Sequence, residues 1–307
     1  MNEICQQPAG EAARQPPSVF TAFGDAFRQM SDLLFRAFNF TQWLVLGLVC
    51  FLAELDTASP GASFNYRLDR ASMRDLTARI TAIRWETAAV LIIIAAVIIA
   101  IVIAVVIVLA YVSCRFRFIY LEGILRARFD LGAQWRAHGA RALSLFLFRL
   151  VAGFIELVLF VPLGLLVLLA IVFYSSAYLP YLVVLAAAAL LVVLFASVIR
   201  TLLMDAVVPV MLFRDIPVLA AWRVVLSLVA TYPLTFLGYV CVRWILGLAG
   251  GILVVAAGCC TCCIGFLPVI AQTISAPVHV TLRLFPVNLL WQMGERHLPL
   301  AHQPPAA

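Results

Sequence analysis

The chain has 307 residues, of which 65% are hydrophobic and 12% are charged. Soluble domains are about 45–50% apolar and about 25% charged, so this composition is typical of a protein embedded in a bilayer. The formal net charge is +6, and every one of the 21 basic residues is Arg. The absence of Lys excludes enzymes that use a lysine Schiff base, a phosphate-loop lysine or a Ser-Lys dyad.

The amino-terminal part of the chain consists of a tail and an amphipathic segment. Residues 1–17 are polar and contain Pro, so we expect a disordered tail. From Ser18 onward an amphipathic helix is predicted, because Phe20, Phe23 and Phe27 recur at spacings of three and four. Such a helix either lies in the lipid headgroup region or docks on the protein's own cytoplasmic surface. The sequence leaves both interpretations open.

Apolar runs long enough to cross a hydrocarbon core of about 30 Å recur along the chain. The most apolar is Thr87–Val112, built almost wholly from Ala, Val, Ile and Leu. A backbone in lipid must satisfy its own hydrogen bonds, so each run is expected to be a helix. The six predicted spans are 38–55, 87–112, 148–174, 181–204, 234–258 and 264–284. The fold class is therefore all-α, a polytopic membrane protein with one membrane domain, 18–293, followed by a polar tail, 294–307.

Two further helices are expected outside these spans. No Gly or Pro occurs between Gly61 and Gly123, so a helix is predicted to begin near Leu68 and to project beyond the membrane before entering it. Pro217–Ala230 is apolar but too short to cross, so it is predicted to be an interfacial helix. Asp215 is a candidate N-cap for that helix.

The segment 113–149 is the most basic connection between predicted spans. Arg near the ends of spans favours the cytoplasmic side, so this connection and, with six spans, both termini are predicted to face the cytoplasm of a bacterial inner membrane. The segment is expected to contact anionic lipid headgroups rather than nucleic acid. The candidate lipid-contacting residues are Arg115, Arg117, Arg126, Arg128 and Arg136.

Several ionisable or polar residues fall inside the predicted spans, where they are costly and point to a functional site. Glu156 and Arg243 are each predicted to lie about 12–14 Å deep on the cytoplasmic side, a depth that would allow them to pair. The candidate binding residues are Glu156, Arg200, Asp205, Arg243, Gln272, His279 and Arg283, the last three forming with Ser275 one face of a helix. They either line a cytoplasm-facing cavity for an anionic headgroup or solute, or hold the helices together.

The cysteine cluster and the remaining histidines give little support to a metal site. Four thiols within five residues cannot easily surround one tetrahedral ion, so no metal is predicted at Cys259, Cys260, Cys262 and Cys263. These cysteines either act as small apolar residues or form a disulfide. Surface positions are predicted for His138, His297 and His302. No catalytic or cofactor-binding motif is found, so neither an enzymatic activity nor a cofactor is predicted.

Two parts of the sequence resemble a known but uncharacterised family. The first comprises Ser113–Phe118, Leu121–Glu122 and Ala142–Arg149, and the second comprises Asp205–Met211 and Ala221–Arg223. Together they resemble a family of bacterial multi-span membrane proteins, and the second is distantly similar to the membrane domain found beside glycerophosphodiester phosphodiesterases. The resemblance implies a fold and a membrane location but no reaction.

Two functions follow as expectations. The first is a non-enzymatic membrane-organising or accessory component that contacts anionic lipid. The alternative is a transporter-like protein that binds an anionic solute or lipid headgroup in the cytoplasm-facing cavity; a bilayer-embedded enzyme ranks third. The sequence indicates neither an oligomeric state nor a protein partner.

Overall fold

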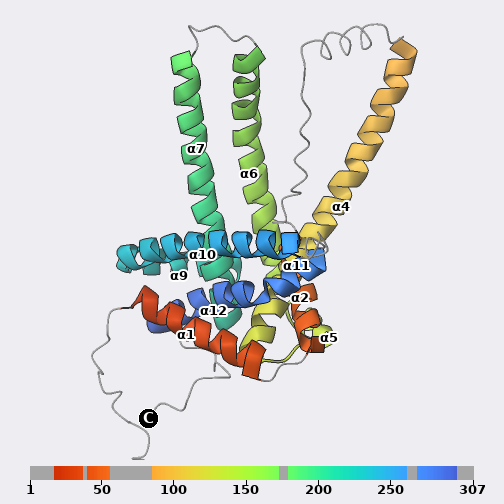
Figure 1. Cartoon of the computed structure of the whole chain (residues 1–307). Helices are drawn as coiled ribbons and strands as arrows, with labels where there is room; N and C mark the ends of the chain where they lie inside the picture. The colour runs from red at the N-terminus through yellow and green to blue at the C-terminus, as the bar shows by residue number, and fades with distance from the viewer. Residues whose placement is uncertain (1–16, 37–39, 56–84, 173–178, 261–267, 296–307) are drawn as a thin grey trace, which may run out of the picture.

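A computed structural model of the chain describes residues 17–36, 40–55, 85–172, 179–260 and 268–295. All regular structure in these ranges is helical, which confirms the predicted all-α fold class. Figure 1 shows a base of packed helices from which long helices rise. The predicted tails fall almost wholly outside the described residues, as does the start of a helix near Leu68.

Four helices within the described ranges are long and apolar enough to cross a membrane by length and composition. They are α4 (Trp85–Arg126), α6 (Gly139–Val172), α7 (Leu179–Leu202) and α10 (Pro233–Cys260). The most apolar windows of α4 and α7 contain no buried side chain. Their branched aliphatic surfaces are therefore not covered by the described protein, which is compatible with membrane-crossing helices.

The basic connection between α4 and α6 is mostly helical. α4 continues beyond the predicted end of its span at Val112 as far as Arg126, and α6 begins at Gly139, before the predicted start of the next span. Between them lies the short helix α5 (Leu131–Ala137), whose N-cap carboxylate, Asp130 Oδ1, accepts a hydrogen bond from the backbone N–H of Ala133 at 3.1 Å.

α7 is extended at its end by a wider turn. The residues Leu203–Val207 form a π-helical turn, and α8 (Val208–Arg214) follows directly. Pro209 does not interrupt the helix here, because it lies in the first turn of α8, where its missing N–H is not needed. α8 ends at Asp215 in a left-handed conformation, and Pro217 is the N-cap of α9 (Val218–Thr231). The prediction of Asp215 as an N-cap is therefore wrong.

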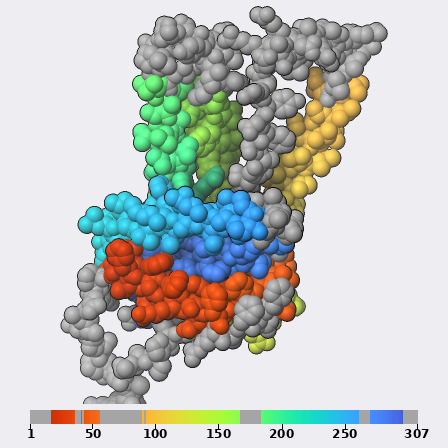
Figure 2. Space-filling view, in the orientation of Figure 1, coloured from red at the N-terminus to blue at the C-terminus, as the bar shows by residue number. Residues whose placement is uncertain are grey.

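The base is built around α12 (Ala276–Gln292), most of whose residues are buried. α1 (Val19–Ser31) lies alongside it, and Figures 1 and 2 show both beneath α10. The face of α1 turned to the base carries Ala22, Ala26 and Met30, whereas Phe20 and Phe27 are exposed. Of the two interpretations of this helix, the structure supports docking on the protein itself.

Two predicted spans are formed by shorter helices. α2 (Phe40–Glu54) has 15 residues and reaches only about 22 Å at 1.5 Å per residue, less than a hydrocarbon core. The described part of 264–284 is two helices, α11 (Pro268–Ile274) and α12, which separate at Ser275 ahead of Pro277. The prediction of a single helix over 264–284 is therefore wrong, because a proline cannot donate the hydrogen bond that continuity requires.

The direction of α10 also differs from the expectation. Figure 1 shows α10 running crosswise to α6 and α7, along the upper edge of the base. Its buried side faces the other helices through Phe236, Tyr239 and Val240, whereas Leu237 and Leu248 on other faces are exposed. Although α10 has 28 residues and is apolar, it is part of the base and is not a fourth upright helix.

Candidate binding site at the base of the long helices

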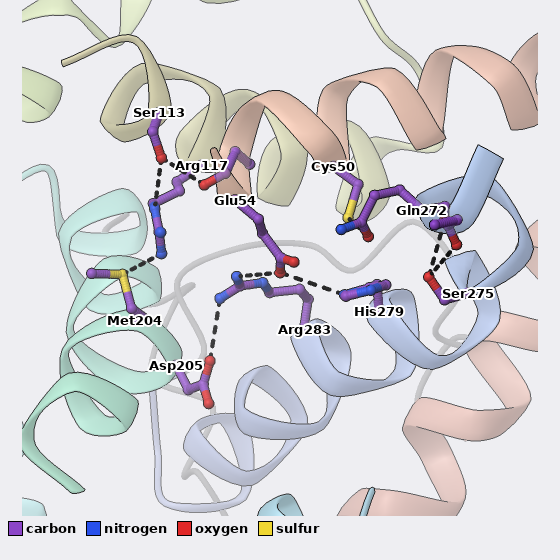
Figure 3. Close-up of polar contacts among 12 residues, drawn as sticks. Cys50, Glu54, Ser113, Arg117, Met204, Asp205, Gln272, Ser275, His279 and Arg283 are labelled. Carbon is purple, nitrogen blue, oxygen red and sulfur yellow. Dashed lines mark hydrogen bonds and ion pairs between the residues drawn. The ribbon is translucent and has the colours of Figure 1, made fainter. Parts of the chain in front are cut away.

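Charged side chains from five elements meet where the upright helices enter the base. Glu54 ends α2, Arg117 lies on α4, and Asp205 lies in the π-helical turn after α7. Arg243 comes from α10 and Arg283 from α12. Figure 3 shows how Glu54, Arg283 and Asp205 point toward one another.

Asp205 is the most enclosed member of this cluster. Its side chain has no exposed surface, and it accepts three hydrogen bonds. The Tyr239 hydroxyl and Arg243 Nε each donate to Oδ2 at 2.8 Å, and Arg283 donates through one terminal nitrogen to Oδ1 at 3.2 Å. A buried carboxylate is costly unless it is paired and hydrogen-bonded, so these three donors explain how Asp205 can be enclosed.

Arg283 connects Asp205 to a second carboxylate. Its other terminal nitrogen donates to Glu54 Oε1 at 3.3 Å, and His279 Nδ1 lies 3.4 Å from the same oxygen. Figure 3 shows this chain of contacts running from His279 through Glu54 and Arg283 to Asp205. α2, α12 and the turn after α7 are thereby linked by one network of charges.

Arg117 is inside the protein, with only 4% of its surface exposed. Its Nε donates to Ser113 Oγ at 3.5 Å and a terminal nitrogen contacts the sulfur of Met204; Ser113 in turn donates to the backbone carbonyl of Ala53 at 2.7 Å. The prediction of Arg117 as a lipid-surface residue is therefore wrong. Arg117 belongs to the buried cluster instead.

Beside the cluster lies a cavity of about 500 Å³. One wall is charged and consists of Glu54, Arg117, Arg200, Asp205, Arg243, His279 and Arg283. The rest of the lining comprises small and apolar residues of α10 and α12, namely Gly247, Gly250, Gly251, Val254, Val278 and Leu282, together with Thr201 and Met204. The wall carries four guanidinium groups and two carboxylates, and one of the four, Arg200, is paired with Glu156 outside the wall, so the charge count leaves an excess of one positive charge before His279 is counted.

Two of the predicted candidates, Glu156 and Arg200, form a separate pair. Both nitrogens at the edge of the Arg200 guanidinium contact the carboxylate of Glu156, with Nε 3.1 Å from Oε1. This pair joins α6 to α7. Glu156 therefore does not pair with Arg243, and it does not line the cavity, although Arg200 does. Sequence depth alone suggested the wrong partner.

Gln272 is placed away from the cavity by the break between α11 and α12. It lies on α11, and its side-chain oxygen accepts a weak hydrogen bond from the thiol of Cys50 at 3.6 Å. Ser275 donates to the backbone carbonyl of Ala271 at 2.7 Å. The predicted stripe is thus divided, and of its members only His279 and Arg283 line the cavity.

Of the predicted lipid-contacting residues, Arg126, Arg128 and Arg136 are exposed at the base, as a surface role requires. Arg126 also pairs with Glu122 at 2.9 Å. Arg115 is instead half-buried, with its guanidinium 4.4 Å from the centroid of the Trp135 ring, a cation–π contact. Arg115 therefore helps to fix α5 against α4.

His138 is buried, so the prediction of a surface position is wrong. Its Nε2 lies 2.6 Å from Glu122 Oε2. Burial lowers the pKa of His138 below its ordinary value, against the opposing hydrogen bond to Glu122. His297 and His302 lie outside the described residues. In the cysteine cluster, Cys259 and Cys260 are free and exposed, while Cys262 and Cys263 are not described.

Sequence reasoning missed three members of the cluster: Glu54, Tyr239 and Arg117 as a buried residue. Glu54 was placed at the end of a predicted span, where a carboxylate ordinarily faces water. A lone acidic residue closing an otherwise uncharged apolar run, Phe40–Glu54, was the available signal. Tyr239 has no comparable signal, since tyrosine is common in membrane helices.

These features define an all-helical protein with membrane-compatible helices and a cationic cavity at their base. The chain belongs to a family of unknown function, DUF7544, whose profile matches residues 18–293. Neither a bacterial origin nor the distant similarity to the glycerophosphodiester phosphodiesterase membrane domain is part of that match. No curated protein and no solved structure matches the chain.

Proposed function

We propose that this protein resides in a bacterial inner membrane and binds an anionic lipid headgroup in the cavity at its base, without a catalytic step. The base carries the exposed residues Arg126, Arg128 and Arg136. Because Arg is concentrated on the cytoplasmic side of membrane proteins, the base faces the cytoplasm. α4, α6 and α7 then cross the bilayer, and α10 lies along its cytoplasmic face.

The charge of the cavity supports an anionic ligand. The two carboxylates of the wall are already occupied by donors, Asp205 by three and Glu54 by Arg283 and His279. Arg200 is paired with Glu156 outside the wall, but the wall still keeps an excess of one positive charge before His279 is counted. Guanidinium groups bind phosphate through paired N–H donors, so a phosphate-bearing headgroup satisfies this excess. This charge balance is the observation on which the proposal rests.

The small and apolar part of the lining supports a lipid rather than a small polar solute. Gly247 and Gly251 are exposed and leave the backbone of α10 open to the cavity. A Cβ atom at Gly251 would meet no other atom within 4 Å, so the space beside it is empty of protein. An apolar lining next to a cationic wall matches the two halves of an amphiphile.

The substitution Gly251→Leu tests this proposal. Its side chain would fill the space along the apolar lining, whereas Gly153→Leu adds the same side chain on exposed α6, where a Cβ also meets nothing within 4 Å. In nanodiscs that contain phosphatidylglycerol and phosphatidylcholine, native mass spectrometry should find phosphatidylglycerol retained by the unaltered protein and by Gly153→Leu. Gly251→Leu should weaken retention about tenfold, equivalent to about 1.4 kcal/mol.

The same experiment distinguishes lipid from free phosphate. If a headgroup attached to acyl chains is the ligand, inorganic phosphate at millimolar concentration will not displace phosphatidylglycerol. Displacement by phosphate alone would assign the cavity to a soluble anion, in line with the transporter-like alternative. Equal retention of phosphatidylglycerol by both leucine variants would contradict the proposed site.

A further inference from the structure

Three side chains with metal-binding atoms converge at one end of the charged network. Cys50 and Glu54 are four residues apart on α2, so they lie on the same face of that helix. His279 approaches them from α12, and Figure 3 shows all three side chains on the same side of Arg283. The thiol sulfur, a carboxylate oxygen and an imidazole nitrogen all lie within 4.8 Å of one another.

We propose that Cys50, Glu54 and His279 form a binding site for a divalent transition-metal ion, with Zn²⁺ as the best fit. A thiolate and a carboxylate together supply two negative charges, which balance a divalent cation, and a neutral imidazole supplies the third ligand. Sulfur, nitrogen and oxygen donors in this combination suit Zn²⁺ rather than Mg²⁺ or Ca²⁺, which prefer oxygen ligands alone. Bringing the three atoms to bonding distance requires only side-chain adjustment.

The surroundings of the three residues are compatible with a bound cation. Arg283 contacts Glu54, but it also donates to Asp205 at 3.2 Å, so it keeps a carboxylate partner when Glu54 binds metal. The Gln272 side-chain oxygen accepts a hydrogen bond from the Cys50 thiol at 3.6 Å; with Cys50 as a thiolate, the Gln272 amide would turn and donate its N–H to the sulfur instead.

The ion also has a route to the site. Glu54 and His279 line the cavity, whereas Cys50 is fully buried behind them. Three protein ligands would leave one coordination position of a tetrahedral ion for water or another ligand, which could reach it from the cavity that Glu54 and His279 line. This site shares Glu54 and His279 with the wall of the proposed headgroup cavity, but it takes a cation and adds the buried Cys50.

The test first removes the clustered thiols, which are the other cysteines closest together in the sequence. In a background in which Cys259, Cys260, Cys262 and Cys263 are changed to Ser, the full-length protein is purified in detergent and loaded with Zn²⁺ or Co²⁺. After dialysis we expect one zinc per chain by elemental mass spectrometry. The cobalt-loaded protein should show a thiolate-to-cobalt charge-transfer absorption.

Matched variants assign the ligands. Cys50→Ser should abolish the charge-transfer absorption, and His279→Ala should lower zinc retention at least tenfold. Cys241→Ser, which removes an exposed thiol on α10, should change neither. Each variant is first checked for a normal elution volume, and Glu54→Gln serves as a further ligand variant if Cys50→Ser does not fold.

Two outcomes would overturn the proposal. One is that the protein with Cys50, Glu54 and His279 intact retains no zinc after dialysis. The other is that the thiolate-to-cobalt absorption is still present in the Cys50→Ser variant. Neither outcome bears on the retention of phosphatidylglycerol, so the two proposals fail independently.

Discussion

At the scale of single residues, Asp205 holds the site together. It is the common acceptor for donors from α10 and α12, and it lies in the turn that ends α7. A carboxylate in this position determines where two arginines lie at the edge of the cavity. Its removal therefore affects both the fold and the charged wall.

We expect Asp205→Asn to destabilise the protein strongly. The substitution leaves Arg243 and Arg283 without the negative charge that compensates them, and breaking a buried ion pair from one side costs about 3–5 kcal/mol. Thermal unfolding in detergent, followed by helical circular dichroism, measures the loss. Asp215→Asn is the control, because Asp215 is 76% exposed and its pair with Arg141 should contribute less than about 1 kcal/mol. Similar unfolding of both variants would contradict the central role of Asp205.

The sequence indicated several site residues but not their partners. Arg243, Asp205, His279 and Arg283 were recognisable because charges in apolar segments are costly. Their pairing depends on how α2, α10 and α12 approach one another, which no local pattern encodes. Glu54 was overlooked for the same reason, since only the fold shows that the end of α2 is enclosed by Arg283 and His279.

At the scale of elements, the close packing of α2 against α11 depends on Gly47. A Cβ atom at this position would lie 2.2 Å from the hydroxyl of Thr273 and 3.1 Å from its Cα. The hydroxyl can rotate away, but the backbone cannot. The approach of these two helices positions Cys50 and Glu54 one and two turns further along α2.

Gly47→Ala should therefore lower the free energy of unfolding by about 1–3 kcal/mol, the usual cost of forcing an extra methyl into packed structure. Gly24→Ala, on α1, provides a control for which we expect the free energy of unfolding to rise instead of fall. A Cβ there meets nothing within 4 Å, and replacing a helical glycine by alanine should stabilise by up to about 1 kcal/mol. The two variants are compared by thermal unfolding, and an unchanged midpoint for Gly47→Ala would show that α11 can move aside.

The helices of the structure were predictable to different degrees. The interiors of α4, α6 and α7 followed from unbroken apolar runs, because a helix in lipid needs no partner to be satisfied. The break between α11 and α12 did not follow, since the apolar run 264–284 predicts one span although it contains Pro277. A proline in an apolar run can bend a helix or end it, and the packing of Ser275 and Ala276 in the base determines which.

At the scale of the whole molecule, the crosswise direction of α10 decides the topology. If α10 crossed the bilayer, its two ends would lie on opposite sides. In the structure both ends lie at the base, together with the exposed arginines of the connection between α4 and α6. Cys260, at the carboxyl end of α10, reports which arrangement holds.

We expect Cys260, kept as the sole cysteine, to be labelled by a membrane-impermeant maleimide in inverted membrane vesicles and not in intact cells. A cysteine at position 136 provides the cytoplasmic control, and one at position 176, in the segment between α6 and α7, provides the external control. Labelling of Cys260 in intact cells would mean that α10 crosses the membrane and that the base is arranged differently in lipid.

This geometry also explains why the predicted pairing of Glu156 with Arg243 failed. Two residues that are equally far along their helices from the cytoplasmic end lie at equal depth in the membrane only if both helices run across the bilayer. α10 runs along the base, so Arg243 stays level with Asp205, while Glu156 sits on upright α6 beside Arg200 of α7. Apolar length measures whether a helix can cross, but not whether it does.

The π-helical turn Leu203–Val207 changes which face of the continuous helix α7–α8 is turned toward the protein core. A turn that holds one residue more than a regular α-helical turn rotates all that follows by about 100° relative to what precedes it. The continuous helix can thus turn one of its faces outward along α7 and a different face toward the protein core along α8. In α8, Val210 and Met211 are fully buried. A single inserted residue thereby converts a lipid-facing helix into a core helix without interrupting it.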